Sequence, residues 1–305
     1  MASESKIITY RSRRSKPAMD LMSQLPHDVK DRIMESLDTR DAARMALVSN
    51  QWKNVWLQHD RLVFDEEFFG WIAQCLSLDD DFSAAFSVMN HILMLRVGPI
   101  KMFVLEVSSW NPTPLQSDID RWCIYLSRNG IEELHLTIFE SISSPGVPKK
   151  LPCTDRDIAL ALPAALNLRM IELDNFKFIW GKHFVFALLL IQKCPKLSKL
   201  KIVQEEDDIL CFMENGENDA SPEDSEDCLI KKDLEMLKTL KVESFCGTRL
   251  EVLFIKTILL KSPTLKEVII VEARANVDAT KALNISKEEL LSFSCASAKA
   301  QIVFR

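Results

Sequence analysis

Histidine, cysteine and glycine build many catalytic and metal sites, but here their spacing indicates none. The histidines are His27, His59, His91, His135 and His183, and none lies at a metal-ligand spacing from another histidine or a cysteine. The eight cysteines include no CxxC pair, and the seven glycines form neither GxGxxG nor GxxxxGK. We therefore expect no enzyme activity, no metal and no cofactor. The chemistry left to consider is binding.

The densest concentration of apolar and aromatic side chains lies between Leu25 and Trp56, where the pattern predicts three short helices. Pro26 suits the first turn of a helix. Asp38 or Thr39 can cap a second helix, and Ser49 can cap a third. An apolar stripe at helical spacing comprises Val29, Ile33, Met34 and Leu37. So short a segment cannot cover this apolar surface by itself, so part of it must be buried against another chain or domain.

The same stretch resembles the F-box. The resemblance rests on Leu25-Pro26, on Val29, Ile33 and Leu37, on Asp41-Ala42, and on Val48-Ser49 followed by Trp52 and Trp56. The chain departs from the family at Asp38-Thr39, where a proline-containing turn is usual, and at Asn50-Gln51, where a basic pair is usual. From the residues alone, a helical cap that packs only on its own domain is the alternative.

The F-box resemblance implies two partners, a Skp-type adaptor and, through it, a cullin. The adaptor-binding residues that it implies are Leu25, Pro26, Val29, Ile33, Leu37, Ala42, Leu47 and Trp52.

Composition and charge narrow the class of protein, its possible partners and its location in the cell. Of the 305 residues, 47% are hydrophobic and 27% charged, which is typical of a folded globular chain. The net charge of −6 argues against nucleic acid as a partner. No apolar run is long enough to cross a bilayer, so we expect no membrane partner. Residues 1–20 lack the apolar core of a secretory signal, which favours the cytosol, the nucleus or both.

Two segments carry unbalanced charge. Residues 1–20 form a basic arm that we expect to be disordered. Residues 204–228 contain eleven Asp and Glu and no Lys or Arg, which predicts a solvated acidic loop. Neither pattern by itself indicates a site.

After Trp56 a sequence unit repeats, in which an amphipathic helix and a break precede apolar residues in the pattern LxxLxL. Its instances are Ile100, Phe103, Leu105; Ile131, Leu134, Leu136; Leu168, Ile171, Leu173; Leu197, Leu200, Ile202; Leu237, Leu240, Val242; and Leu265, Val268, Ile270. Two units match each other directly, since residues 190–202 align with residues 258–270 through Pro195 and Pro263. A proline cannot continue the helix and directs the chain into extended structure. Within each strand, the period of two sends the apolar positions inward.

These units resemble an irregular leucine-rich-repeat domain, and the residues from about 229 onward resemble the FBD region of plant F-box proteins. The fold class that follows is α/β, with an N-terminal three-helix F-box, an irregular leucine-rich-repeat solenoid and a C-terminal FBD-like region. The expected boundaries are a basic arm at 1–20, an F-box at 21–60, repeats with the acidic loop 204–228 at 61–228, and the final repeats with the FBD-like region at 229–305.

Taken together, the resemblances imply the substrate-recognition subunit of a Skp-cullin-F-box ubiquitin ligase, which would bind an unknown protein target through its repeats. A ligand-sensing co-receptor and a non-degradative scaffold bound to the adaptor are the alternatives. If the apolar positions of each strand point inward, charged partners point outward and form a candidate target-binding face. Its residues are Glu172, Asp174, Lys199, Lys201 and Lys241.

Overall fold

The computed structural model describes residues 21–76, 83–106, 116–137, 167–176, 178, 181–204, 230, 232–273 and 277–305. The basic arm at 1–20 lies outside the described residues, as does the acidic loop after Gln204.

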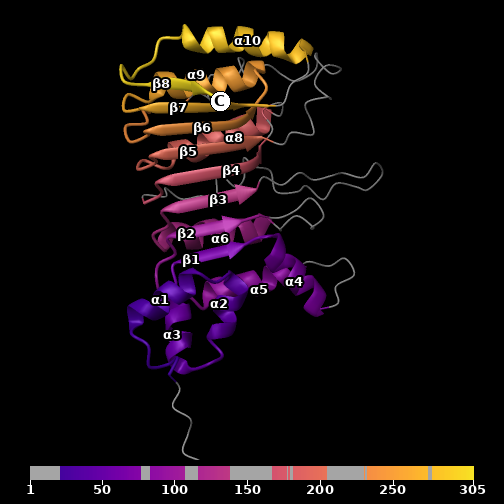
Figure 1. The fold of residues 1–305 in the computed structure, drawn as a ribbon, viewed down its shortest axis with the longest axis vertical. Helices are drawn as coiled ribbons and strands as arrows, with labels where there is room; N and C mark the ends of the chain where they lie inside the picture. Colours follow the sequence, from indigo (N-terminus) through magenta and orange to yellow (C-terminus); the bar gives the residue numbers. More distant parts are fainter. Residues whose placement is uncertain are drawn as a thin grey trace, which may run out of the picture.

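One sheet of eight strands dominates the described residues, and its strands lie side by side in the order of the chain. Every neighbouring pair is parallel. The strands are β1 (Arg61–Phe64), β2 (Met102–Leu105), β3 (Glu133–Thr137), β4 (Met170–Phe176), β5 (Lys199–Gln204), β6 (Thr239–Phe245), β7 (Glu267–Glu272) and β8 (Gln301–Phe304). Figure 1 shows this ladder rising from β1 at one end to β8 at the other.

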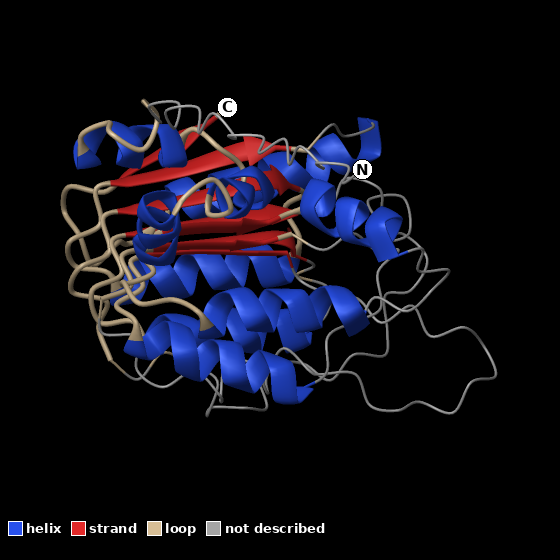
Figure 2. Cartoon of the chain, turned by 90° about the horizontal axis from the view of Figure 1, so that it is seen from below, coloured by secondary structure: helices blue, strands red, loops and turns tan. Residues whose placement is uncertain are grey.

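Helices connect most of the strands, because a parallel pair needs a crossover rather than a tight turn. They are α4 (Glu66–Leu76), α5 (Ser83–Met94), α6 (Gln116–Arg128), α8 (Gly181–Gln192), α9 (Arg249–Lys261) and α10 (Val277–Leu291). Figure 2 shows a row of helices along one face of the sheet. The core lies between these helices and the strands.

The core positions predicted from the period of two are confirmed. Two rows of side chains cross neighbouring strands in register. The first row is Leu62, Phe103, Leu134, Ile171, Leu200, Leu240 and Val268, and the second is Phe64, Leu105, Leu136, Leu173, Ile202, Val242 and Ile270. All are buried except Leu136, which is half-buried. Each unit contributes two or three apolar side chains, so stacking the units builds a core that no single unit could form.

The predicted sequence of helix, proline break and strand is also confirmed in both matching units. Helix α8 ends at Gln192 and β5 begins at Lys199, with Pro195 between them. Helix α9 ends at Lys261 and β7 begins at Glu267, with Pro263 between them.

Three short helices precede the sheet, as the sequence predicts: α1 (His27–Glu35), α2 (Thr39–Met45) and α3 (Asn50–Gln58). Pro26 is the residue before α1. The Asp38 carboxylate caps α2 by accepting from the Asp41 N–H at 2.6 Å. The Ser49 hydroxyl caps α3 by accepting from the Trp52 N–H at 3.4 Å. In Figure 1 these helices lie at the β1 end of the ladder. The fold is therefore an N-terminal helical unit followed by a mixed α/β unit with a parallel sheet.

Candidate protein-docking surfaces

The N-terminal unit exposes five large apolar side chains, in the turn before α1, on α1 and in the turn between α2 and α3, which we call the apolar patch. Its members are Leu21, Met22, Val29, Leu47 and Val48. Leu47 is 86% exposed, the largest value among the exposed large hydrophobic side chains of the described residues. The hydrogen bond from the Ser23 hydroxyl to the Ser49 hydroxyl brings the turn before α1 next to the turn before α3. Several exposed apolar side chains on so small a unit favour a protein-interaction site.

The structure divides the predicted adaptor-binding residues into three groups. Pro26, Val29 and Leu47 are exposed. Leu25, Ile33 and Leu37 are half-buried and pack against the core. Ala42 and Trp52 are 0% exposed, so in this conformation their side chains have no area to offer a partner. Their role here is to hold α2 and α3 in place beneath the surface residues.

A buried lysine fixes the N-terminal turn against α3. The Lys30 ammonium donates to the Ser23 carbonyl and to the Gln51 side-chain oxygen, each at 2.6 Å. The Ser23 hydroxyl donates to the Ser49 hydroxyl at 2.7 Å. An amide oxygen suits residue 51 because a basic side chain there would face the Lys30 cation. This contact gives a physical reason for the departure from the usual basic pair.

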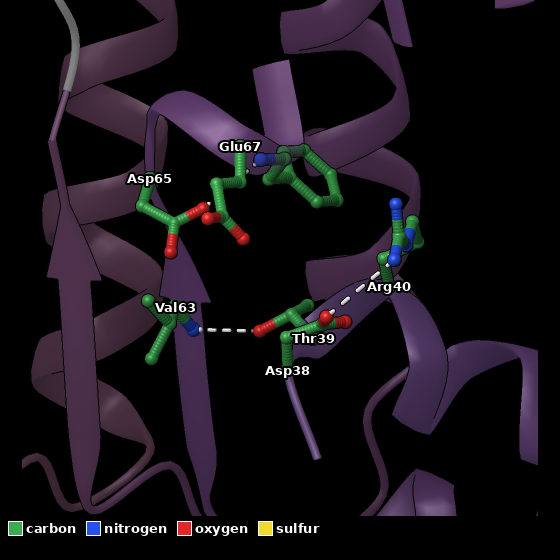
Figure 3. Close-up of a pocket in the computed structure, with 7 residues that line it drawn as sticks. Asp38, Thr39, Arg40, Val63, Asp65 and Glu67 are labelled. Carbon is green, nitrogen blue, oxygen red and sulfur yellow. Dashed lines mark hydrogen bonds and ion pairs between the residues drawn. The ribbon is translucent and has the colours of Figure 1, made fainter. Parts of the chain in front are cut away.

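The helical unit is also tied to the first strand. The Thr39 hydroxyl, at the start of α2, accepts from the Val63 N–H of β1 at 2.8 Å. Figure 3 shows this bond beside a small pocket between α2, β1 and the start of α4. The pocket is lined by Asp38, Thr39, Arg40, Val63, Asp65, Glu67 and Phe68. Thr39 thereby satisfies an N–H of the edge strand that no neighbouring strand can reach.

A second tie joins α3 to the segment before β2. The Arg96 guanidinium lies 3.9 Å from the centre of the Trp56 ring and donates to the Trp56 carbonyl. Burial lowers the pKa of Arg96 to about 10, so the group is still charged near neutral pH. The carbonyls at the C-terminus of α3 favour this cation. Gly98 permits the close approach, because a Cβ there would lie 3.0 Å from the backbone of Gln58.

The open face of the sheet holds a row of paired polar and charged side chains. Glu172 lies between His135, whose Nδ1 is 3.1 Å away, and Lys201, whose Nζ is 2.5 Å away. Lys201 also reaches Glu243 at 3.5 Å, and Glu243 pairs in turn with Lys241. The strand register explains this row, because residues 135, 172, 201 and 241 lie opposite one another on successive strands from β3 to β6.

Of the predicted target-binding residues, this row of paired side chains brings Glu172, Lys201 and Lys241 together. Lys199 is exposed and outside it, and Asp174 forms no hydrogen bond or ion pair within the described part of the protein. His135 and Glu243 also belong to this row but were not among the predicted target-binding residues. The period of two places both on the same face of the sheet, but it does not show which side chains they contact. Most of the charge that the sequence offers to a target is therefore matched within the sheet.

Asp174 is a half-buried carboxylate that this network leaves unmatched. Its pKa is raised to about 6, first because burial removes water and then because Glu172 repels it. Glu106 and Glu243 add repulsion, while Lys201 opposes the shift. The ionised form is thus less stable in the folded chain than in the unfolded chain.

We expect Asp174→Asn to raise the stability of the folded chain at neutral pH. Because the folded pKa is above the unfolded one, folding favours the protonated acid, and the stability that it contributes falls as pH rises from about 4 to about 6. Thermal unfolding of both proteins between pH 4 and 8 measures this. The variant should melt higher at neutral pH and match the wild type near pH 4. A lower melting temperature at neutral pH would contradict the assignment.

Within the described ranges, no three His, Cys, Asp or Glu side chains form a group that could hold a metal ion. None of the described helices is long and apolar enough to cross a membrane.

Comparison with known proteins identifies the N-terminal unit. Residues 22–64 match the F-box domain family, which covers α1 to α3 and continues through β1. An F-box/FBD/LRR-repeat protein of Arabidopsis thaliana is 35% identical over 125 residues, which are 40% of this chain and 28% of the relative. A second putative protein of that description, from the same plant, is 24% identical over 199 residues, or 61% of this chain and 39% of the relative. An Arabidopsis F-box/LRR-repeat protein is 29% identical over 202 residues, or 60% of this chain and 43% of the relative. The chain spans less than half the length of these curated relatives.

Proposed function

We propose that this protein, an F-box protein of the plant F-box/FBD/LRR-repeat type, is the substrate-recognition subunit of a Skp-cullin-F-box ubiquitin ligase. It would bind a Skp-type adaptor through residues 21–60 and a protein target through the α/β unit. It would perform no chemistry itself. Its contribution would be to hold a target lysine near the ubiquitin-carrying enzyme, because proximity raises the effective concentration of the reacting groups. Such a complex works in the cytosol or the nucleus.

The apolar patch is the observation that carries this proposal. An F-box match by itself identifies a domain, whereas the patch provides that domain with an exposed surface on which an adaptor can bury apolar area. Leu47 and Val48 lie in the turn between α2 and α3, and Val29 lies on α1. We assign Pro26, Val29 and Leu47 as direct contacts and Leu25, Ile33 and Leu37 as their supports.

For the α/β unit we propose a leucine-rich-repeat architecture over residues 61–228 and an FBD-like region over residues 229–305. The parallel strands in chain order and the two rows of buried apolar side chains support the first assignment. The names of the matched relatives support the second. The target would lie against the open face or one edge of this sheet.

Reconstitution tests the proposal. The purified chain should bind an immobilised Skp-type adaptor, and addition of the cullin and the ubiquitin-carrying enzymes should place ubiquitin on a protein that co-purifies with the chain from plant extract. Mass spectrometry identifies that protein. If the chain does not bind any Skp-type adaptor of the plant, the proposal is wrong. Adaptor binding without ubiquitin on any co-purified protein would instead favour the non-degradative scaffold.

A further inference from the structure

The end of the sheet at which β5, β6 and β7 begin carries lysines that have no carboxylate partner among the described residues. Lys199 is the first residue of β5, Lys238 precedes β6 and Lys266 precedes β7. All three side chains are exposed, and none forms an ion pair with the described residues. Lys196, in the turn before β5, is also exposed and donates to the Asn167 side-chain oxygen at 3.2 Å. We call these four lysines the basic edge.

Hydrogen bonds between the turns place Lys238 and Lys266 next to each other and beside Ser198. Lys199 is one residue further along β5, in register with Thr239 of β6 and, through it, with Glu267 of β7. The Lys266 N–H donates to the Lys238 carbonyl at 2.9 Å, and the Lys238 N–H donates to the Ser198 carbonyl at 2.9 Å. The three turns are therefore neighbours at the strand spacing of about 4.8 Å. Like charges on adjacent strands destabilise a sheet, so this arrangement does not serve the stability of the fold.

Many other basic side chains of the sheet and its helices are matched, although Arg61 of β1 and Arg128 of α6 form no ion pair with the described residues. Lys101 pairs with Asp60, Arg169 with Glu132, Lys201 with Glu172 and Glu243, Lys241 with Glu243, Lys256 with Glu289, and Lys287 with Glu272. Two carboxylates, Glu235 and Glu267, lie in the turn before β6 and at the start of β7, and neither forms an ion pair with the described residues.

We propose that the basic edge binds an acidic peptide segment of a partner protein. From β5 to β7 the edge spans about 10 Å, which an extended peptide covers with about three residues. The short span favours a few carboxylates over a long polyanion. The exposed large hydrophobic side chains of the described residues are Leu, Met, Val and Ile, so these residues offer no exposed Phe, Tyr or Trp ring for nucleic-acid bases to stack on. The net charge of −6 would also repel a long nucleic acid.

This inference does not depend on the adaptor, so it stands or falls separately from the proposed function. A fluorescein-labelled oligoglutamate peptide is the probe, and its fluorescence anisotropy measures binding to the full chain at low and at physiological salt. Binding should weaken with salt, because surface charges are screened. An oligoglutamine peptide of equal length should not bind.

The double variant Lys238→Glu with Lys266→Glu should bind the oligoglutamate peptide at least about tenfold more weakly than the wild type, because two attractions become repulsions. The matched control is Arg32→Glu with Lys53→Glu, which changes the net charge equally at exposed residues of α1 and α3. Its affinity should stay within about twofold of the wild type. Equal weakening in both double variants would show only the effect of net charge and would overturn the proposal.

Stability supplies a second readout. The single variant Lys238→Glu places a carboxylate beside Lys266, so its melting temperature should equal or exceed that of the wild type while its affinity for the peptide falls. A lower melting temperature together with unchanged affinity would assign the lysines to structure and overturn the proposal.

Two further outcomes would also overturn it. Tighter binding of a single-stranded oligouridine than of oligoglutamate would change the class of partner to nucleic acid. If the peptide binds only after residues 205–227 are deleted, the edge is satisfied by the chain's own acidic segment rather than by a partner.

Discussion

Leu47→Glu is expected to weaken adaptor binding about thirtyfold or more while the protein stays folded. The Leu47 side chain is 86% exposed, so the substitution removes almost no packing inside the chain. At the proposed interface it puts a charge where apolar area should be buried. Loss of an anchor at such an interface costs about 2 kcal/mol or more, which is about a thirtyfold loss of affinity. Titration calorimetry with the Skp-type adaptor measures the change, and circular dichroism confirms that the variant is folded.

The matched control is Ile285→Glu, which introduces the same charge at a side chain that is 67% exposed on α10. This helix lies at the opposite end of the ladder from α1 to α3 in Figure 1, so adaptor affinity should not change. Equal affinity of the Leu47 variant and the control would exclude Leu47 as an anchor. The pair Leu25→Ala and Pro26→Ala is a weaker test, because Leu25 packs against the core and its loss also lowers stability.

Glu251→Ala should destabilise the C-terminal half of the sheet by about 3 to 5 kcal/mol, because it leaves several half-buried donors unpaired. Glu251 is 0% exposed, and its carboxylate accepts from the Cys246 N–H at 3.0 Å and the Thr248 N–H at 2.5 Å. It also accepts from the side-chain amide of Gln204, the last residue of β5. One side chain thus joins the end of β5, the turn after β6 and the start of α9. Denaturant unfolding of the wild type and the variant at neutral pH measures the loss of stability.

Glu251→Gln separates the loss of charge from the loss of acceptors. Burial raises the pKa of Glu251 despite its hydrogen bonds, so the charged form is already disfavoured. The amide keeps one acceptor oxygen, and we expect this variant to lose less stability than the alanine variant. Glu288→Ala, at an exposed position of α10, is the control and should change stability by less than about 0.5 kcal/mol. An alanine variant at 251 as stable as this control would show that Glu251 does not hold these elements together.

Local patterns predicted much of the fold. The period of two identified the inward positions of each strand, and Pro195 and Pro263 marked the breaks between helix and strand. Asp38 and Ser49 cap α2 and α3 as expected, since a cap depends on residues within one helical turn. These features follow from the sequence because their interactions span only a few residues.

The same patterns could not assign the surface of the F-box helices. Apolar spacing identifies residues that avoid water, but it does not say whether the chain itself or a partner covers them. Trp52 and Ala42 were predicted to be docking residues, yet their side chains are fully buried in the chain's own core. Leu47, predicted in the same set, is almost fully exposed. Only the packing of α1, α2 and α3 against one another and against β1 separates the two groups.

The sequence by itself determined a domain of helices followed by repeated units of helix and strand. Hydrophobic periodicity and the residues that begin or end a helix act over only a few positions, so both can be recognised without the tertiary structure. The tertiary structure decided which charges are free. Lys201 meets Glu172, 29 residues earlier, only because β4 and β5 pair in a particular register, and Glu243 joins them from β6. Lys238 and Lys266 have no such partner among the residues that the structure describes. Ion pairing depends on distances of a few ångströms between strands far apart in the chain, and strand register, not composition, sets those distances.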